Sequence, residues 1–197
     1  MRVKIIALFS VIVLAVAGLG FALSAAAVTK VAATDPAAVS RALGAAVAQL
    51  EVEGLSAERW LASKAADPAT AAVFAAGTEK AKAEAATAVC NSISDAAAKA
   101  PDLLGIRPAL VMLVGTDGKV VGRDGSSLMR GDGVGTPYPS LMAAIAAGTP
   151  MSDVWVNRDR NEQMLASYAP VRGPDGKVLG DLVVGRSLND DRLGAAT

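Results

Sequence analysis

Residue types that carry most enzyme chemistry are scarce in this chain. Histidine is absent from all 197 positions, which excludes histidine triads, histidine general bases and histidine metal ligands. The single cysteine, Cys90, permits no disulfide within the chain and no cysteine-rich metal site. Cys90 falls on an apolar stripe without a Lys or Arg at helical spacing, so it is expected to be a buried small hydrophobe. We expect no catalytic residue, no metal site and no cofactor.

Two aspartates keep one enzymatic alternative open. Asp153 and Asp181 lie in segments with a strand pattern, and a pair of carboxylates can supply a general acid and a general base. No nucleophile with an adjacent base is visible beside them. A hydrolase-type enzyme is therefore the alternative to a binding function.

Charge and glycine content bear on two further partner classes. Lys plus Arg and Asp plus Glu are equal at 19 each, so the chain has no basic footprint for nucleic acid. Residues 131–135 have alternating glycines, but no apolar strand directly precedes them and no Gly-Lys-Ser/Thr ending follows. We expect neither nucleic acid nor a nucleotide as a partner.

Two hairpins organise the second half of the chain. Residues 109–114 and 119–123 have a strand pattern, as do residues 164–171 and 178–185. Each pair is joined by a turn containing Asp-Gly-Lys, where Gly can take a positive φ and Asp can bond the backbone just after it. The pattern predicts two antiparallel hairpins.

A short helix over residues 139–147 and a strand over 151–157 are predicted between the hairpins. The order after Ala100 is then strand, strand, helix, strand, strand, strand. It predicts a five-stranded antiparallel sheet with a helix and a long loop across one face.

Alanine-rich helices precede the first strand. We expect one helix from Pro36 to about Ala66, a short one opened by Asp67-Pro68 and ending at Ala76 before Gly77, and a third capped by Thr78. Their small residues would let two copies approach closely, so a homodimer through the N-terminal helices is an open expectation.

The N-terminus predicts export. Residues 5–28 carry no charge and are long enough to cross a hydrocarbon core of about 30 Å. Arg2 and Lys4 precede this run, which places the N-terminus in the cytoplasm and everything after Lys30 outside. Small residues at 24–27 leave a cleaved signal peptide as the alternative, although the apolar run is longer than such peptides usually have. We expect a bacterial inner-membrane anchor, with the rest of the chain in the periplasm or outside the cell.

Several segments resemble the Cache family of PAS-like extracytoplasmic sensor domains. They are Thr-Asp-Gly-Lys-Val-Val at 116–121, Ala-Ala-Gly at 146–148, Ser-Tyr-Ala-Pro-Val-Arg at 167–172 and Asp-Gly-Lys-Val-Leu-Gly at 175–180. The resemblance covers about residues 31 to 188. It implies an α+β fold with an N-terminal membrane helix, long helices and then a PAS-like five-stranded antiparallel sheet.

The resemblance implies a sensor that binds a small molecule outside the cell, such as a carboxylate, amino acid or amine, and takes part in transmembrane signal transduction. Members of the family are parts of chemoreceptors, histidine kinases or cyclic-dinucleotide enzymes. Here no second membrane helix and no output domain are visible, so we expect a fragment, for example the first part of a double-Cache sensor, or a protein that signals through a partner. An exported hydrolase-type enzyme and a structural or partner-binding exported module are the alternatives.

The expected organisation has four parts. They are a membrane anchor or signal peptide at 1–30, a helical region at 31–107, a PAS-like Cache sheet domain at 108–188 and the start of a connector helix at 189–197.

In a PAS-like sheet the ligand lies between the strand face and the helix and loop that cross it. The strands contribute Asp153, Trp155 and Tyr168, and the covering segment contributes Arg130 and Tyr138. An aromatic floor with one Arg and one Asp suits a small zwitterion or carboxylate, because Arg pairs an acid group through two hydrogen bonds. We expect these five residues to bind the ligand.

Overall fold

The structure is a computed structural model that describes residues 36–126, 128–157 and 162–188. The predicted membrane span and the predicted connector at 189–197 lie outside these ranges. Within them, no helix combines the length and the apolar character that crossing a bilayer requires. The chain divides into two compact units, one of residues 53–187 and one of residues 1–52 with 188–197.

From residue 36 onward, the helical segments before the sheet are α3 at Pro36–Ala65, α4 at Pro68–Phe74, α5 at Glu79–Ala97 and the 3-10 turn η1 at Pro101–Leu103. The two predicted caps are confirmed, because Asp67 accepts a hydrogen bond from the Ala69 amide at 2.9 Å and Thr78 accepts one from the Ala81 amide at 3.1 Å. The predicted end of the short helix at residue 76 is wrong. Helix α4 stops at Phe74 because the next amides bond carbonyls three residues back, which tightens the last turn.

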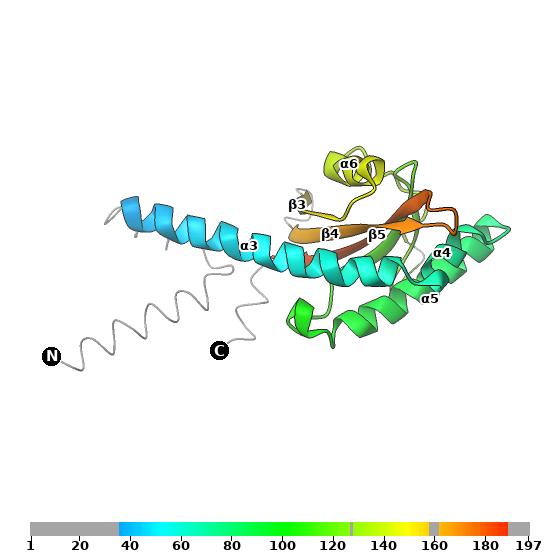
Figure 1. Cartoon of the computed structure of the whole chain (residues 1–197), viewed down its shortest axis with the longest axis horizontal. Helices are drawn as coiled ribbons and strands as arrows, with labels where there is room; N and C mark the ends of the chain where they lie inside the picture. The colour runs from blue at the N-terminus through cyan, green and yellow to red at the C-terminus, as the bar shows by residue number, and fades with distance from the viewer. Residues whose placement is uncertain (1–35, 127, 158–161, 189–197) are drawn as a thin grey trace. The chain divides into compact units, whose positions relative to one another are not determined.

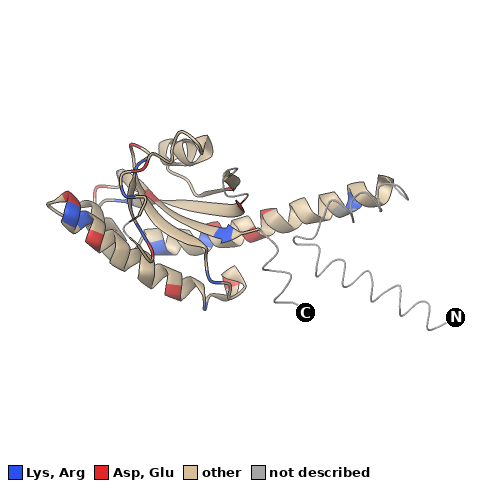
Figure 2. Cartoon of the chain, turned by 180° about the vertical axis from the view of Figure 1, so that it is seen from behind, with Lys and Arg blue, Asp and Glu red and all other residues tan. Residues whose placement is uncertain are grey.

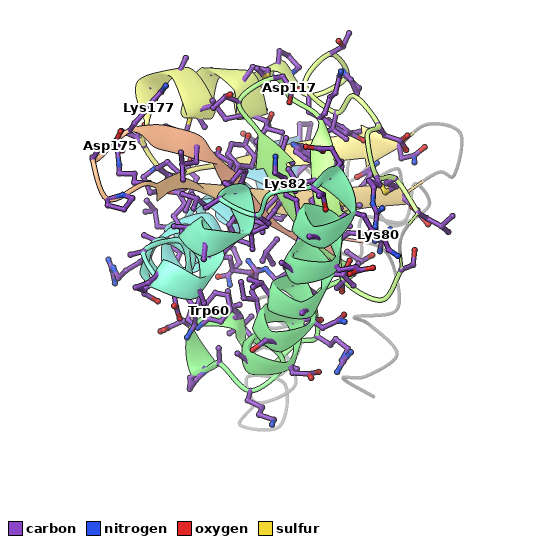
Figure 3. All side chains as sticks on the ribbon, turned by 90° about the vertical axis from the view of Figure 1, so that its right-hand side faces the viewer. Trp60, Lys80, Lys82, Asp117, Asp175 and Lys177 are labelled. Atoms are coloured by element: carbon purple, nitrogen blue, oxygen red, sulfur yellow. The ribbon has the colours of Figure 1, made fainter. Side chains whose placement is uncertain are left out.

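The predicted five-stranded antiparallel sheet is confirmed. Its strands are β1 at Leu110–Gly115, β2 at Val120–Arg123, β3 at Met151–Asn157, β4 at Glu162–Arg172 and β5 at Val178–Ser187. Their order is β2-β1-β5-β4-β3, so the last strand of the chain pairs with β1 and joins the two hairpins. Both hairpin turns consequently lie at one end of the sheet, as the labelled Asp117 and Asp175 show in Figure 3.

The hairpin turns form as their sequences predict. Gly118 has φ of 75° and Gly176 has φ of 78°, a region that glycine enters without steric cost. Asp117 accepts a hydrogen bond from the Lys119 amide at 3.1 Å, and Asp175 accepts one from the Lys177 amide at 3.1 Å. Local turn chemistry therefore determines where each hairpin reverses.

Two apolar layers cover the two faces of the sheet. Figure 1 shows α4 and α5 on one side and α6, at Pro139–Ala147, on the other. The first layer joins the end of α3, α4 and α5 to alternate side chains of β1, β4 and β5, and it includes the fully buried Cys90. Cys90 is buried on the apolar side of α5, as predicted, and burial raises the pKa of its thiol to about 12. The second layer lies under α6 and the loop before it.

Charged residues are distributed over helices and loops with both signs interspersed (Figure 2). This pattern agrees with the zero net charge of the chain.

Candidate ligand-binding site under helix α6

Strand alternation selects the side chains that face α6. Successive side chains of a strand point to opposite faces, and Met112, Tyr168 and Val183 all belong to the apolar layer under this helix. Tyr168 is paired with Met151 of β3 on one side and with Val183 of β5 on the other. Met151, Tyr168 and Val183 thus form a row across three strands, and every second residue along each strand from this row faces α6.

Three aromatic side chains meet at the β3 edge of this face. The rings of Tyr138 and Trp155 are stacked, with centroids 3.8 Å apart and planes 3° from parallel. The Trp155 and Tyr168 rings are tilted by 32° with centroids 6.1 Å apart. Trp155 and Tyr168 are buried and Tyr138 is half-buried. The structure thus brings together one aromatic from the covering segment and two from adjacent strands.

Asp153 lies beside this aromatic cluster, whereas Arg130 does not contact it. Asp153 is exposed, and its carboxylate accepts a hydrogen bond from the Ser140 hydroxyl at 2.7 Å, which links β3 to the first turn of α6. Arg130 is also exposed, on the loop before α6, and its guanidinium has no hydrogen-bond or ion-pair partner within the described ranges. Four of the five expected ligand residues are therefore gathered, and Arg130 makes no hydrogen bond or ion pair with them.

Several buried polar atoms under α6 have no hydrogen-bond partner in the part of the chain that the structure describes. They are the indole nitrogen of Trp155, the hydroxyl of Tyr168 and both carboxylate oxygens of Asp181. Burial raises the pKa of Tyr168, although Ser140 and Trp155 lie close enough to lower it in part. Leaving a buried polar group unsatisfied costs about 1–3 kcal/mol. Such groups on one face of one layer are candidates for contact with a bound molecule.

Asp181 is the least expected of these groups. It is fully buried, and its neighbours in the sheet are Val114 on β1 and Pro170 on β4. Burial raises the pKa of its carboxyl group from 3.8 to about 7. The sequence pattern suggests only an acid–base partnership with Asp153. The signal for a binding role was a carboxylate within the otherwise apolar run at 178–185, two residues before Val183 and therefore on the same face of the strand.

The geometry disfavours an acid–base pair of Asp153 and Asp181. Asp153 pairs with Ala166 and Asp181 with Pro170. Four residues of β4 separate these partners, roughly 13 Å at about 3.3 Å per residue. Two carboxylates that act on one glycosidic bond are usually about 5–9.5 Å apart.

Methionines form much of the remaining surface under α6. The chain has six, and all but Met1 belong to this layer or pack against it: Met112, Met129, Met142, Met151 and Met164. Methionine side chains are flexible and polarisable, and they adapt to ligands of different shape. Sequence alone does not reveal this clustering, because the five residues are spread over four elements and a loop.

A buried ion pair attaches α3 to the opposite face of the sheet. A guanidinium nitrogen of Arg186 lies 3.4 Å from the Glu53 carboxylate, and another donates a hydrogen bond to the Glu53 carbonyl at 3.3 Å. The next residue of the helix, Gly54, accepts a hydrogen bond from the Ser152 hydroxyl at 3.3 Å through its carbonyl. Neither charged residue has a role predicted from the sequence.

Comparisons with known proteins support the fold. No family model and no curated protein sequence matches the chain. The sensor domain of the Vibrio cholerae histidine kinase DctB is similar, with a TM-score of 0.55 and 15% identity, over 77% of this chain and 54% of that one. The chain thus spans about half the length of that domain.

Two further solved structures are more distant. The sensor domain of Escherichia coli DcuS has a TM-score of 0.49 and 14% identity, over 76% of this chain and 96% of that one. The ligand-binding domain of the Campylobacter jejuni chemoreceptor Tlp3, solved with 4-methylisoleucine, has a TM-score of 0.40 and 16% identity, over 70% of this chain and 55% of that one.

The fold class is therefore that of Cache-type, PAS-like sensor domains, as predicted. The structure that supports this assignment is the sensor domain of the histidine kinase DctB. At these identities the similarity concerns the fold, and function has to be argued from the site.

Proposed function

We propose that this chain is the extracytoplasmic sensor domain of a transmembrane signalling protein and that it binds a small molecule between α6 and the sheet. One observation carries the proposal. Both carboxylate oxygens of Asp181 are buried without a hydrogen-bond partner within the described ranges, on the same sheet face as Trp155 and Tyr168 under α6, where a ligand would satisfy them. The fold shared with the DctB sensor domain supports the same function.

The binding residues that we propose are Arg130, Tyr138, Asp153, Trp155 and Tyr168. The stacked Tyr138 and Trp155 rings supply an apolar wall, and the exposed Asp153 supplies a charge at its margin. Arg130, exposed on the loop before α6, is proposed to pair an acid group of the ligand. A carboxylate, an amino acid or an amine of small size fits this combination.

Ligand-induced stabilisation tests the binding function. The purified chain is heated with members of a library of small carboxylates, amino acids and amines. A ligand at 100 times its dissociation constant adds about 2.7 kcal/mol to the free energy of unfolding, which raises the melting temperature measurably. Turnover of ester, peptide or glycoside substrates with no ligand-induced shift would favour the hydrolase alternative.

The proposed location is the bacterial inner membrane, with the chain after about residue 30 in the periplasm or outside the cell. The uncharged run at 5–28 and the preceding Arg2 and Lys4 support it. Membrane fractionation with alkaline extraction tests the anchor. A soluble mature protein that begins near residue 27 would contradict the proposed anchor and would still be consistent with export.

A further inference from the structure

We propose that Asp181 binds the ammonium group of the ligand, which makes the ligand an organic amine with an apolar body. The inference rests on the proposed function and assigns a charge to its unidentified ligand. Asp181 is fully buried, faces α6 and offers two carboxylate oxygens that no described residue engages. It adds a residue outside the set expected from the sequence.

No protein cation serves this carboxylate within the described ranges. Its ladder partners, Val114 and Pro170, are apolar, and so is Val183, the next side chain of β5 on the same face. Arg186, the buried basic side chain, engages Glu53 in the layer on the other face. A buried carboxylate requires either a proton or a cation close to it. A proton meets this requirement in the ligand-free chain, and an ammonium group of the ligand can take its place.

The surroundings suit an amine with an apolar body. Tyr168 lies diagonally across from Asp181, at a position usually about 7–8 Å away. Its hydroxyl oxygen can accept a second hydrogen bond from an ammonium group, and an aromatic face attracts a cation. Methionine side chains such as Met112 and Met142 in the same layer can pack against a hydrocarbon body.

Ligand charge distinguishes the three proposed ligand classes, which are carboxylates, amino acids and amines. A carboxylate ligand beside Asp181 could bind only while Asp181 keeps its proton, because two like charges in a buried layer repel each other. An amine, including an amino acid oriented with its ammonium toward β5, removes that conflict. The indole N–H of Trp155 then remains for an oxygen acceptor at the other end of the ligand.

Matched probes test the assignment on the full chain in detergent. Isoamylamine, isoamyl alcohol and 4-methylpentanoate share a branched apolar body and differ in charge, as do phenethylamine, phenethyl alcohol and 3-phenylpropanoate. Isothermal titration should show amine binding to the wild type and at least tenfold weaker binding to Asp181→Asn. The matched control Asp175→Asn, in an exposed turn, should bind amines like the wild type.

Proton release provides a second measurement that does not depend on the variant folding. Because Asp181 must ionise to pair with an ammonium group, amine binding near pH 6 should release protons. Titration in buffers of different ionisation enthalpy measures this release in the wild-type chain. Amine binding without proton release would overturn the assignment.

Other outcomes separate this assignment from the sensor function. Binding of the carboxylate or alcohol probes with no binding of the amines overturns the assignment and leaves the sensor function standing. Amine binding that is lost in Asp153→Asn and retained in Asp181→Asn also overturns the assignment of Asp181 and leaves the sensor function standing. Failure of every library compound to stabilise the chain contradicts the sensor function itself.

Discussion

At the scale of single residues, Asp181 links protonation to folding. Its carboxyl pKa is raised by burial from 3.8 to about 7, so the folded state holds its proton more tightly than the unfolded state. This stabilisation is complete below about pH 4 and is lost as the pH rises through about 7. The slope is at most about 1.4 kcal/mol per pH unit. Urea midpoints of the ligand-free chain should therefore fall from pH 4.5 to 7.5 relative to Asp181→Asn, and parallel profiles would refute this effect.

Arg130 tests the charged margin of the site. Its side chain is exposed and has no hydrogen-bond or ion-pair partner within the described ranges, so Arg130→Ala should leave the melting temperature of the free chain unchanged. If Arg130 closes on an acid group of the ligand, affinity should fall at least tenfold, or about 1.4 kcal/mol. Titration of a ligand found in the library decides the matter. Unchanged affinity would remove Arg130 from the site.

Residue types predict one part of the site well and another part poorly. The aromatic cluster could be predicted because Trp and Tyr are rare, at two each, and three of these four residues fall in the segments that cover or form the sheet. Asp181 and the methionine surface could not, because their significance depends on what surrounds them. Burial and the absence of a nearby cation are properties of the folded layer and not of the strand pattern.

At the scale of elements, the buried pair of Glu53 and Arg186 holds α3 against β5. Arg186→Leu should destabilise the chain by about 3 kcal/mol, because Glu53 then loses this partner in a buried position. Replacing both residues, in Glu53→Met/Arg186→Leu, should recover part of that loss. The matched control is Arg59→Leu, at an exposed position of the same helix. A double variant less stable than Arg186→Leu in urea unfolding would contradict this account.

The packing of α5 on β2 requires a residue without a side chain at 122. A Cβ atom on Gly122 would lie 2.6 Å from the Cβ of Ala86 and 3.1 Å from the Ala83 carbonyl oxygen. Gly122→Ala should therefore destabilise by about 1–3 kcal/mol, because α5 has to move outward. A Cβ atom on Gly133 would meet no described atom within 4 Å, so Gly133→Ala serves as the control. Equal chemical-denaturation midpoints for the two variants would show that α5 accommodates a side chain at position 122 without a loss of stability.

Strands, turns and helix starts follow from local chemistry, which is why they could be predicted closely. Asp-Gly-Lys turns and the Asp67 and Thr78 caps use side-chain bonds to the nearest backbone groups. The end of α4 could not be predicted, because Ala75 and Ala76, which follow its last residue, favour a helix and give no signal that it ends. Glu53 and Arg186, which join α3 to the sheet, are 133 positions apart in the sequence. The residue pattern within each element therefore does not predict that they pair.

At the scale of the whole molecule, residues 36–52 of α3 belong to a different compact unit from residues 53–187. Leu43 and Val47, one helical turn apart, are 53% and 47% exposed. Val52, 61% exposed, lies near the opposite side of the same helix at 3.6 residues per turn. The stripe of Leu43 and Val47, together with the alanine-rich sequence, supports a second copy of the chain as the partner of this side of the helix.

Cysteine crosslinking in membranes distinguishes that stripe from the rest of the helix. L43C and V47C should form disulfide-linked dimers rapidly under mild oxidation, because equivalent positions near a two-fold axis come close together. V52C is the matched control, since it is equally exposed on the other side and should crosslink slowly. The native Cys90 does not interfere, because it is fully buried. Similar crosslinking rates at all three positions, measured on non-reducing gels, would show that this stripe does not form the dimer contact.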